Sequence, residues 1–347
     1  MAEPQENQFG IEIRGLSKIF GPRATDMAAL VAQGISKAEL NERHGHVLGL
    51  RDINIDMPAG RIQVIMGLSG SGKSTLIRHI NRLIDPTVGE ILVGGEDVVK
   101  MDAGALRTFR RHKTAMVFQK FALLPHRTVL ENTVYGLEVQ GVPRARQVDE
   151  AMRWIARVGL GGFEKHYPNQ LSGGMQQRVG LARALTNDAP ILLMDEAFSA
   201  LDPLIRTDMQ TVLLDIQKEI RKTIVFITHD LDEALRLGDR IAILRDGEIV
   251  QQGTSQDIVL RPADDYVESF VREVNRGKVI EVDAVMTPLA GDGAPGSPQV
   301  PVGTTVDEAI GTLVAGTGDS LTITGTDGVP VGAVTLRQLA AALTSAR

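Results

Sequence analysis

The sequence predicts an α/β fold, because short apolar runs that suit buried parallel strands alternate with longer segments of helical periodicity. Three of these runs, 62–66, 191–194 and 223–227, are rich in β-branched or aliphatic residues, as expected for strands covered on both faces. A glycine-rich turn over 67–75 lies directly between the first run and a helical pattern. The order strand, glycine loop, helix is typical of a phosphate-binding α/β core.

The length and composition place further bounds on the fold and on the partners. A chain of 347 residues suggests two domains, or one large domain with an appendage, and 43% hydrophobic residues suffice for a large core. The net charge of −6 argues against a nucleic-acid partner. The absence of cysteine excludes disulfides and thiolate metal sites and fits a cytoplasmic protein. The polar, acidic start predicts no signal peptide, and no run of about 18 apolar residues occurs, so we expect another polypeptide to cross any membrane involved.

The first third of the chain predicts strands interrupted by a helical insertion. Alternating apolar residues predict a strand over 11–20, and strand character returns over 47–57. Between them, about 23–46 is predicted to be helical, with a capping box at Ser36 that restarts a helix after Gly34. After the glycine-rich turn, a helix is predicted with three apolar residues on one face: Leu76, Ile80 and Leu83.

The middle of the chain predicts a helical subdomain set into the α/β core. An edge hairpin is predicted over 90–95, and a strand over 115–118 ends at Gln119. The segment 120–188 is mostly helical in pattern. Within it, four residues are predicted to share one helix face: Ala151, Met152, Ile155 and Val158. Downstream, an Asp-Gly turn at 246–247 predicts a hairpin over 241–250.

The composition changes near Gly277, which predicts a boundary between a domain over 9–277 and a small module over 278–347. Residues 287–303 contain four prolines and four glycines and are predicted to be a linker or long loop. A capping box at Thr305 opens a helix, two strands follow around Asp327-Gly328, and a last helix is predicted over 336–343. This β-α-β-β-α pattern carries seven acidic and two basic residues from 280 onward, so we expect a separate α+β unit with an acidic surface.

The glycine-rich turn fits the pattern G-x-x-x-x-G-K-[ST], which is typical of a phosphate cradle. Its glycines let backbone N–H groups face the phosphates, and the following helix contributes a partial positive charge. Lys73 can reach the β- and γ-phosphates, and the Ser74 hydroxyl can ligate Mg²⁺. The sequence therefore predicts that a nucleoside triphosphate binds through this turn. The predicted contacts are Gly67, Leu68, Ser69, Gly70, Ser71, Gly72, Lys73, Ser74 and Thr75.

Four polar residues follow core strands, where the hydrolysis of a nucleotide needs them. Asp195 and Glu196 end the 191–194 run, so Asp195 can hold Mg²⁺ and Glu196 can act as the base that polarises water. Taken alone, an Asp-Glu pair is more often a solvated strand end, but behind four apolar residues and downstream of a phosphate loop it indicates a functional pair. His229 follows the 223–227 run and can contact the γ-phosphate. Gln119 can offer its amide oxygen to Mg²⁺ or orient the water.

A second glycine-rich turn, Leu171–Arg178, opens another helix. By the same physical argument it is a second anion site, although Ser172 in isolation could be a simple helix N-cap. Nothing beside it in the sequence could supply a base or a metal ligand. We therefore interpret it as a site that closes on a nucleotide bound elsewhere.

Together these motifs resemble the ATP-binding subunit of ABC transporters over about residues 10–270. The resemblance implies a P-loop NTPase cassette: a RecA-like core, an antiparallel β subdomain and the inserted helical subdomain. It implies a head-to-tail homodimer in which each ATP lies between one chain's phosphate loop and Ser172, Gly173 and Gly174 of the other. It also implies that Phe20 stacks on adenine, and that Ser199–Asp202 communicates across the dimer. Met175 stands where many members have glutamine.

The helical insertion and the C-terminal module resemble those of glycine betaine/L-proline (quaternary amine) importers. That resemblance implies a subunit on the cytoplasmic face of the membrane, whose region Gln119–Val129 contacts a membrane permease, with a substrate-binding protein as an indirect partner. It also implies a CBS-like tail that regulates transport, senses ionic strength or braces the dimer. The alternatives are an importer for methionine or a polyamine, a soluble non-transport ABC ATPase, and a sensor driven by its tail. A DNA-repair ABC ATPase would need a long coiled coil between the two glycine-rich turns, and a translation factor would need two cassettes. The sequence shows neither feature.

Overall fold

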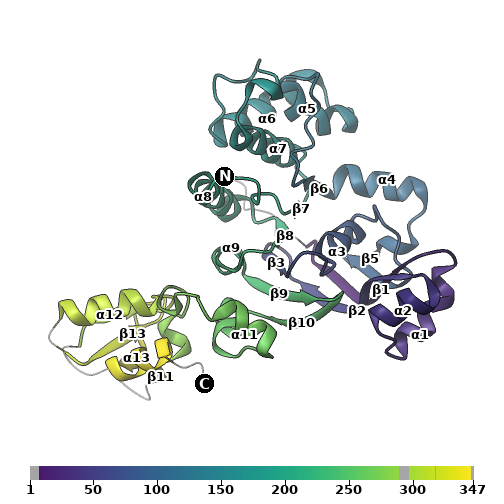
Figure 1. Ribbon diagram of the computed structural model, residues 1–347. Helices are drawn as coiled ribbons and strands as arrows, with labels where there is room; N and C mark the ends of the chain where they lie inside the picture. The colour runs from purple at the N-terminus through teal and green to yellow at the C-terminus, as the bar shows by residue number, and fades with distance from the viewer. Residues whose placement is uncertain (1–7, 289–296, 317, 345–347) are drawn as a thin grey trace. The chain divides into compact units, whose positions relative to one another are not determined.

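The computed structural model describes residues 8–288, 297–316 and 318–344, and Figure 1 shows its helices and strands. Contacts divide the chain into two compact units, one ending at Val250 and one beginning at Gln251. The predicted domain boundary at 277–278 stays a prediction. In the described ranges, no helix is both long and apolar enough to cross a membrane.

A four-stranded antiparallel sheet forms the N-terminal part of the first unit. Its order is β2-β1-β4-β5. The strands are β1 Ile11–Phe20, β2 Val47–Met57, β4 Val88–Val93 and β5 Glu96–Asp97. Alternate residues of β1 and β2 are buried, as the period of two in the sequence predicts. The predicted strands over 11–20 and 47–57 and the predicted hairpin are confirmed.

A six-stranded sheet carries the predicted α/β core, in the order β10-β9-β3-β8-β7-β6. Its strands are β3 Ile62–Met66, β6 Thr114–Val117, β7 Ile191–Asp195, β8 Thr223–Thr228, β9 Arg240–Arg245 and β10 Glu248–Gly253. Every residue of β3, β7 and β8 is buried. Adjacent strands pair in parallel along the series β9-β3-β8-β7-β6. The carboxyl ends of β3, β7 and β8 therefore meet at one edge of the sheet, where the predicted site residues follow.

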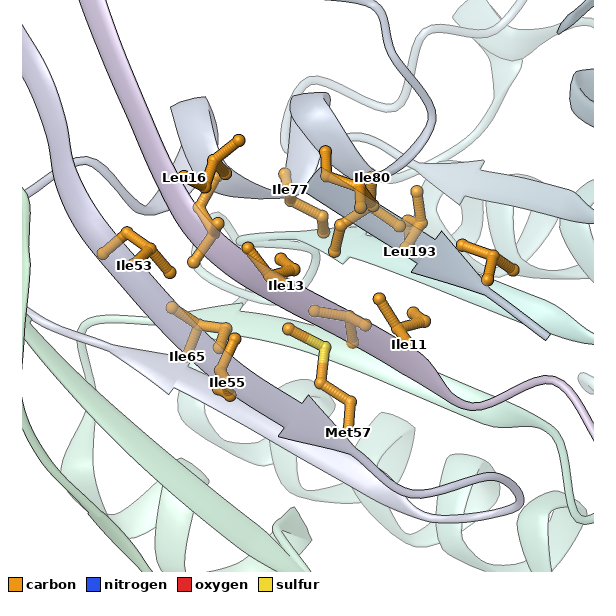
Figure 2. Close-up of a cluster of buried hydrophobic side chains, with 14 of the residues drawn as sticks. Ile11, Ile13, Leu16, Ile53, Ile55, Met57, Ile65, Ile77, Ile80 and Leu193 are labelled. Atoms are coloured by element: carbon orange, nitrogen blue, oxygen red, sulfur yellow. The ribbon is translucent and has the colours of Figure 1, made fainter. Parts of the chain in front are cut away.

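The main core lies where the two sheets share helix α3, Lys73–Ile80. Figure 2 shows Ile77 and Ile80 of this helix beside Ile11, Ile13 and Leu16 of β1. The predicted apolar face of α3 is wrong in one member. The helix ends at Ile80 with Asn81 as its C-cap, so Leu83 lies beyond it and is exposed. The apolar spacing of four and then three residues continued by chance past the end of the helix.

The predicted insertion forms a 3-10 turn, Ala24–Met27, and two helices, α1 Ala28–Ala32 and α2 Lys37–His44. The Ser36 side chain caps α2 by accepting a hydrogen bond from the Glu39 backbone N–H at 3.1 Å. Four buried residues give the insertion a small core of its own with the ends of β1 and β2: Ile19, Val31, Leu40 and Leu48. The insertion is thus anchored to the strands that flank it.

The predicted helical subdomain consists of α5 Val129–Gln140, α6 Arg144–Arg157 and α7 Gly173–Thr186, which pack on one another (Figure 1). A further helix, α4 Ala103–His112, precedes β6. The predicted face of α6 is corrected at one position, because Met152 is exposed and Trp154 is buried instead. Residues at 151, 154, 155 and 158 follow the helical period, whereas 152 lies next to that stripe. Two helices follow β7 and β8: α8 Pro203–Ile220 and α9 Leu231–Leu237.

The second unit holds α10 Ser255–Leu260 and α11 Asp265–Val271, then the C-terminal module. The module's sheet has the order β11-β14-β13-β12. Its elements are β11 Thr287–Pro288, β12 Gln299–Pro301, α12 Val306–Ala315, β13 Ser320–Thr324, β14 Pro330–Thr335 and α13 Leu336–Thr344. The predicted capping box at Thr305 is present.

The predicted loop over 287–303 is corrected at both ends, because β11 and β12 lie within it. Each strand is short and contains a proline, and β12 pairs along only three residues of β13. Such strands give no alternating pattern in the sequence. Residues 289–296 of the predicted loop lie outside the described residues.

Candidate functional site

The phosphate loop joins the end of β3 to the start of α3, as the sequence predicts. Gly70 and Gly72 have φ values of 80° and 105°, a conformation that favours glycine. A Cβ atom on Gly72 would lie 2.8 Å from the backbone oxygen of Gly49. The loop therefore needs glycine for its backbone conformation and for its close approach to β2.

Lys73 is buried, with 4% of its side chain exposed. Its Nζ donates hydrogen bonds to the backbone oxygens of Gly67 and Leu68, at 2.8 and 3.1 Å, and lies 3.5 Å from Glu196 Oε1. Burial lowers the pKa of the Lys73 ammonium, and the Glu196 and Asp195 carboxylates act in the opposite direction. The amino group is thus folded back into the phosphate loop, where a phosphate anion would compete with these carbonyl oxygens for it.

Ser74 and Asp195 come together from α3 and the end of β7. The Ser74 hydroxyl donates to Asp195 Oδ1 at 2.8 Å, and Arg78 NH2 lies 3.4 Å from Asp195 Oδ2. A hydroxyl and a carboxylate oxygen in contact beside a phosphate cradle form the hard-oxygen donor set that Mg²⁺ prefers. In the described residues, no group of three or more His, Asp or Glu side chains could hold a metal ion by itself. The donor set therefore fits a Mg²⁺ ion that takes its remaining ligands from phosphate and water.

Glu196 lies at the centre of the candidate site, and its backbone is strained. Its φ of 46° is unusual for a residue with a side chain, and its backbone N–H donates to Ile227 O of β8 at 3.2 Å. The Gln119 side-chain amide donates to Glu196 Oε2 at 3.0 Å. His229 Nδ1 lies 3.6 Å from the same oxygen, and 54% of the His229 side chain is exposed. The structure thus brings Gln119 and His229, which follow β6 and β8, to the carboxylate of Glu196, which follows β7.

Phe20 lies at the end of β1 with a partly exposed ring. A Cβ atom on Gly49 would lie 2.7 Å from the Phe20 ring, and the Gly49 backbone oxygen is also the atom closest to a Cβ on Gly72. Lys18 Nζ lies 5.1 Å from the centre of the ring. Gly49 thus separates the Phe20 ring from the phosphate loop, a position suited to a planar base on a nucleotide bound there.

The second glycine-rich turn precedes α7 in the helical subdomain. The Ser172 side chain caps this helix by accepting a hydrogen bond from the Met175 backbone N–H at 3.3 Å. Cβ atoms on Gly173 and Gly174 would meet Phe121 and Ile205, respectively. Ser172 and Gly173 are exposed. Asp202, at the start of α8, is also exposed and makes no side-chain cap to that helix.

Sequence reasoning missed three polar residues that hold these loops. The buried Asn132 side chain accepts from Leu124 N and donates to the backbone oxygens of Leu124, Arg127 and Thr128. Arg183 of α7 donates to the backbone oxygens of Phe121 and Ala122 at 3.2 and 2.8 Å. Arg206 of α8 donates to loop 199–201 and pairs with Asp230. No local pattern marks these residues, because each bonds to backbone oxygens that only the folded chain brings within reach.

The sequence matches the ABC transporter family over residues 50–199. It is 54% identical to the glycine betaine transport ATP-binding protein OpuAA of Bacillus subtilis, over 81% of this chain and 67% of that protein. This chain belongs to the ABC transporter ATP-binding subunits. It is also 52% identical to the glycine betaine/proline betaine transport system ATP-binding protein ProV of Escherichia coli, over 78% of this chain and 67% of that protein. The resemblance drawn from the sequence motifs is thereby confirmed.

The fold comparison agrees with this assignment. A dimeric structure of the ATP-binding cassette MJ0796, described as a post-hydrolysis state bound to ADP and Pi, matches with a TM-score of 0.60 and 32% identity. The match covers 70% of this chain and 98% of that chain. The P-loop NTPase cassette, ATP binding and ATPase activity predicted from the sequence are confirmed at the level of the family. The CBS-like nature of the C-terminal module stays a prediction.

Proposed function

We propose that this subunit hydrolyses ATP to drive the import of glycine betaine or a related quaternary amine through a separate membrane permease. The ATPase activity is supported by one observation: the side chains of Lys73, Gln119 and His229 converge on the Glu196 carboxylate beside the phosphate loop. The cargo rests on the names of the two relatives, which are ATP-binding proteins of glycine betaine transport systems.

Hydrolysis follows from the roles that the geometry allows. The phosphate loop binds the triphosphate with its backbone N–H groups, and Lys73 exchanges its carbonyl partners for phosphate oxygens. Mg²⁺, held by Ser74 and Asp195 and, as the sequence predicts, by the Gln119 amide oxygen, would supply charge neutralisation on the phosphates. Glu196 then accepts a proton from the attacking water, and His229, within reach of Glu196 and open to solvent, contacts the γ-phosphate. The Gln119 amide nitrogen donates a hydrogen bond to the Glu196 carboxylate.

The site is proposed to be completed by a second copy of the chain. Ser172, Gly173 and Gly174 lie at an exposed helix N-terminus, whereas the base and the metal ligands all lie around the phosphate loop. A helix N-terminus attracts anions, so a partner chain's turn can close on the γ-phosphate of ATP held by Lys73. Phe20 would stack on the adenine, and Ser199–Asp202 would contact the partner. The dimeric state of the cassette MJ0796 supports this arrangement.

Two backbone anchors support a role for Gln119–Val129 as the surface that meets the permease. Phe121 and Ala122 have positive φ values of 51° and 48°, and Arg183 of α7 donates to both of their carbonyl oxygens. Asn132 holds the rest of the loop. Because Arg183 belongs to the helix that Ser172 caps, a movement of α7 on dimer closure would be transmitted to this loop. The subunit would then act at the cytoplasmic face of the membrane.

Reconstitution of this subunit with its permease in liposomes tests the cargo. We expect glycine betaine to be taken up only with ATP present, and methionine and spermidine not to be taken up. Uptake of methionine or spermidine instead would replace the cargo while keeping the importer. ATP hydrolysis without uptake of any of the three would favour a non-transport ATPase. The same liposomes with a chain ending at Val279 would show whether the predicted CBS-like module regulates transport or only braces the dimer.

A further inference from the structure

Helix α8 begins directly after the loop Ser199–Asp202, and one face of it contacts both this loop and the start of α9. Arg206 and Gln210 lie four residues apart, so they share this face of the helix. Arg206 NH2 donates to Leu201 O at 3.2 Å and to Ser199 O at 3.5 Å. One guanidinium therefore holds two carbonyl oxygens of the loop that follows Glu196.

The same guanidinium reaches the residue next to His229. Arg206 NH1 lies 3.1 Å from Asp230 Oδ2, while Asp230 Oδ1 accepts a hydrogen bond from Glu233 N and so caps α9. The Asp230 backbone N–H donates to Thr228 Oγ1 at 3.0 Å, which fixes the chain on the other side of His229. The two neighbours of His229, Thr228 and Asp230, are thus hydrogen-bonded to each other, and Asp230 is paired with Arg206.

A second contact from α8 reinforces the first. Gln210 donates to the buried Glu233 carboxylate at 3.1 Å, and the Thr228 side chain also bonds to Glu233. Arg206 and Asp230 are both partly exposed, and such pairs add little to stability by themselves. A planar guanidinium nonetheless fixes geometry well, because its donors point in set directions. The contact is better suited to positioning than to stabilising the fold.

We propose that Arg206 is a positioning residue that couples the loop Ser199–Asp202 to His229 through Asp230. The proposal rests on the proposed function, in which Ser199–Asp202 meets the partner chain and His229 contacts the γ-phosphate. Contact with the partner would set the backbone of the loop, Arg206 would follow its carbonyl oxygens, and Asp230 would bring His229 to the phosphate. Hydrolysis would then depend on contact between the partner chain and the loop Ser199–Asp202.

A double-mutant cycle of Arg206→Gln and His229→Ala in the full-length chain tests the proposal. If Arg206 acts through His229, Arg206→Gln lowers kcat about tenfold in the wild-type background and less than twofold when His229 is already alanine. ATP affinity, measured by fluorescent-ATP titration, stays within twofold of wild type. Arg206→Lys keeps the charge but loses the planar fork, so an intermediate kcat is expected. An equal loss of kcat in both backgrounds would overturn the proposal.

Two further variants separate positioning from a loss of folding. Asp230→Asn removes the ion pair from the other side and should lower kcat to the same extent as Arg206→Gln, with no further loss when the two are combined. Arg61→Gln is the matched control, because Arg61 pairs with Asp239 at 3.2 Å before β3, at the strand end opposite the phosphate loop. Its kcat should equal that of wild type. If Arg206→Gln fails to fold, the cycle is made with Asp230→Asn, and an equal loss in both backgrounds again overturns the proposal. A wild-type chain that binds but does not hydrolyse ATP would refute the proposed function instead.

Discussion

The chain contains two glycine-rich turns that open helices, and they differ in what surrounds them. At the phosphate loop, glycines adopt positive φ values, Lys73 is buried beneath them, and the Asp195 and Glu196 carboxylates lie within hydrogen-bond or ion-pair distance of α3 residues. At the turn before α7, Ser172 caps the helix in an ordinary extended conformation and is exposed. Both turns can attract an anion, but the phosphate loop alone has a base and metal ligands beside it.

The difference indicates that two copies of the chain contribute different parts of one nucleotide site. A helix N-terminus contributes a modest attraction for phosphate, of about 0.3–2 kcal/mol, which is too little for an independent nucleotide site. The same attraction suffices to complete a site in which most of the binding energy comes from elsewhere. Variants at the phosphate loop should therefore change ATP binding by a single chain. Variants at the turn before α7 should change only the closed dimer.

The largest effect is expected from Glu196→Gln, which keeps the shape of the side chain but removes the base. Turnover should fall by about 10²–10⁴, because general-base catalysis supplies an acceleration of this size. ATP binding should persist, since Lys73 and the backbone of the phosphate loop remain. Steady-state ATPase assays and a fluorescent-ATP titration measure the two quantities. Near-normal hydrolysis would exclude Glu196 as the base.

Lys73→Ala should weaken ATP binding by a single chain. A charge-assisted hydrogen bond of this kind contributes about 1.5–3 kcal/mol, which corresponds to roughly 10- to 150-fold in affinity. Ser172→Ala is the comparison from the other turn, and its single-chain affinity should match that of wild type. Equal losses in the two variants would mean that the two turns are not divided between chains as proposed.

Phe20→Ala tests whether the ring beside Gly49 supports the base. Aromatic stacking on a base contributes about 1–3 kcal/mol, so ATP affinity should fall by about 5- to 150-fold. Inorganic tripolyphosphate has no base, and its affinity for the two proteins should be the same. A parallel loss with tripolyphosphate would show that the substitution disturbs the phosphate loop rather than a stacking contact.

The smallest effect is expected from Glu233→Gln, in the layer behind His229. Burial raises the pKa of the Glu233 carboxyl above its usual value near 4.5, so the folded chain holds this proton more tightly than the unfolded chain. The stability that this proton contributes is complete below pH 4.5 and is lost as the pH rises through the raised value. Urea unfolding from pH 4 to 7 should therefore show wild type losing stability relative to Glu233→Gln. A difference in stability between the two proteins that does not change with pH would contradict this prediction.

Much of the fold and most of the candidate site followed from local sequence rules. The strands β3, β7 and β8 are apolar runs, and the phosphate loop has a fixed pattern of glycines, so both could be predicted from a few adjacent residues. Capping by Ser36 and Thr305 was equally local. Glu196 and His229 were predicted because the carboxyl ends of parallel strands meet at one edge of the sheet.

The features that the sequence did not predict depend on residues that are distant in the chain. Arg206 and Asp230 are separated by most of α8 and by β8, and neither has a neighbour that marks it as one of a pair. Both Met152, on α6, and Leu83, beyond the end of α3, fitted an apolar spacing but are exposed. The strands β11 and β12 are too short, and too rich in proline, for a period of two to be visible. The strained backbone of Glu196 likewise has no local sequence cause.

The most direct test of the composite site is the mass of the Glu196→Gln protein with and without ATP, measured by sedimentation or light scattering. We predict a monomer without nucleotide and a dimer with ATP, because bound ATP is no longer cleaved and the two chains stay closed. Adding Ser172→Arg to Glu196→Gln should abolish this dimer while each chain still binds ATP. A dimer that persists with Ser172→Arg, or a Glu196→Gln protein that stays monomeric with saturating ATP, would contradict the account.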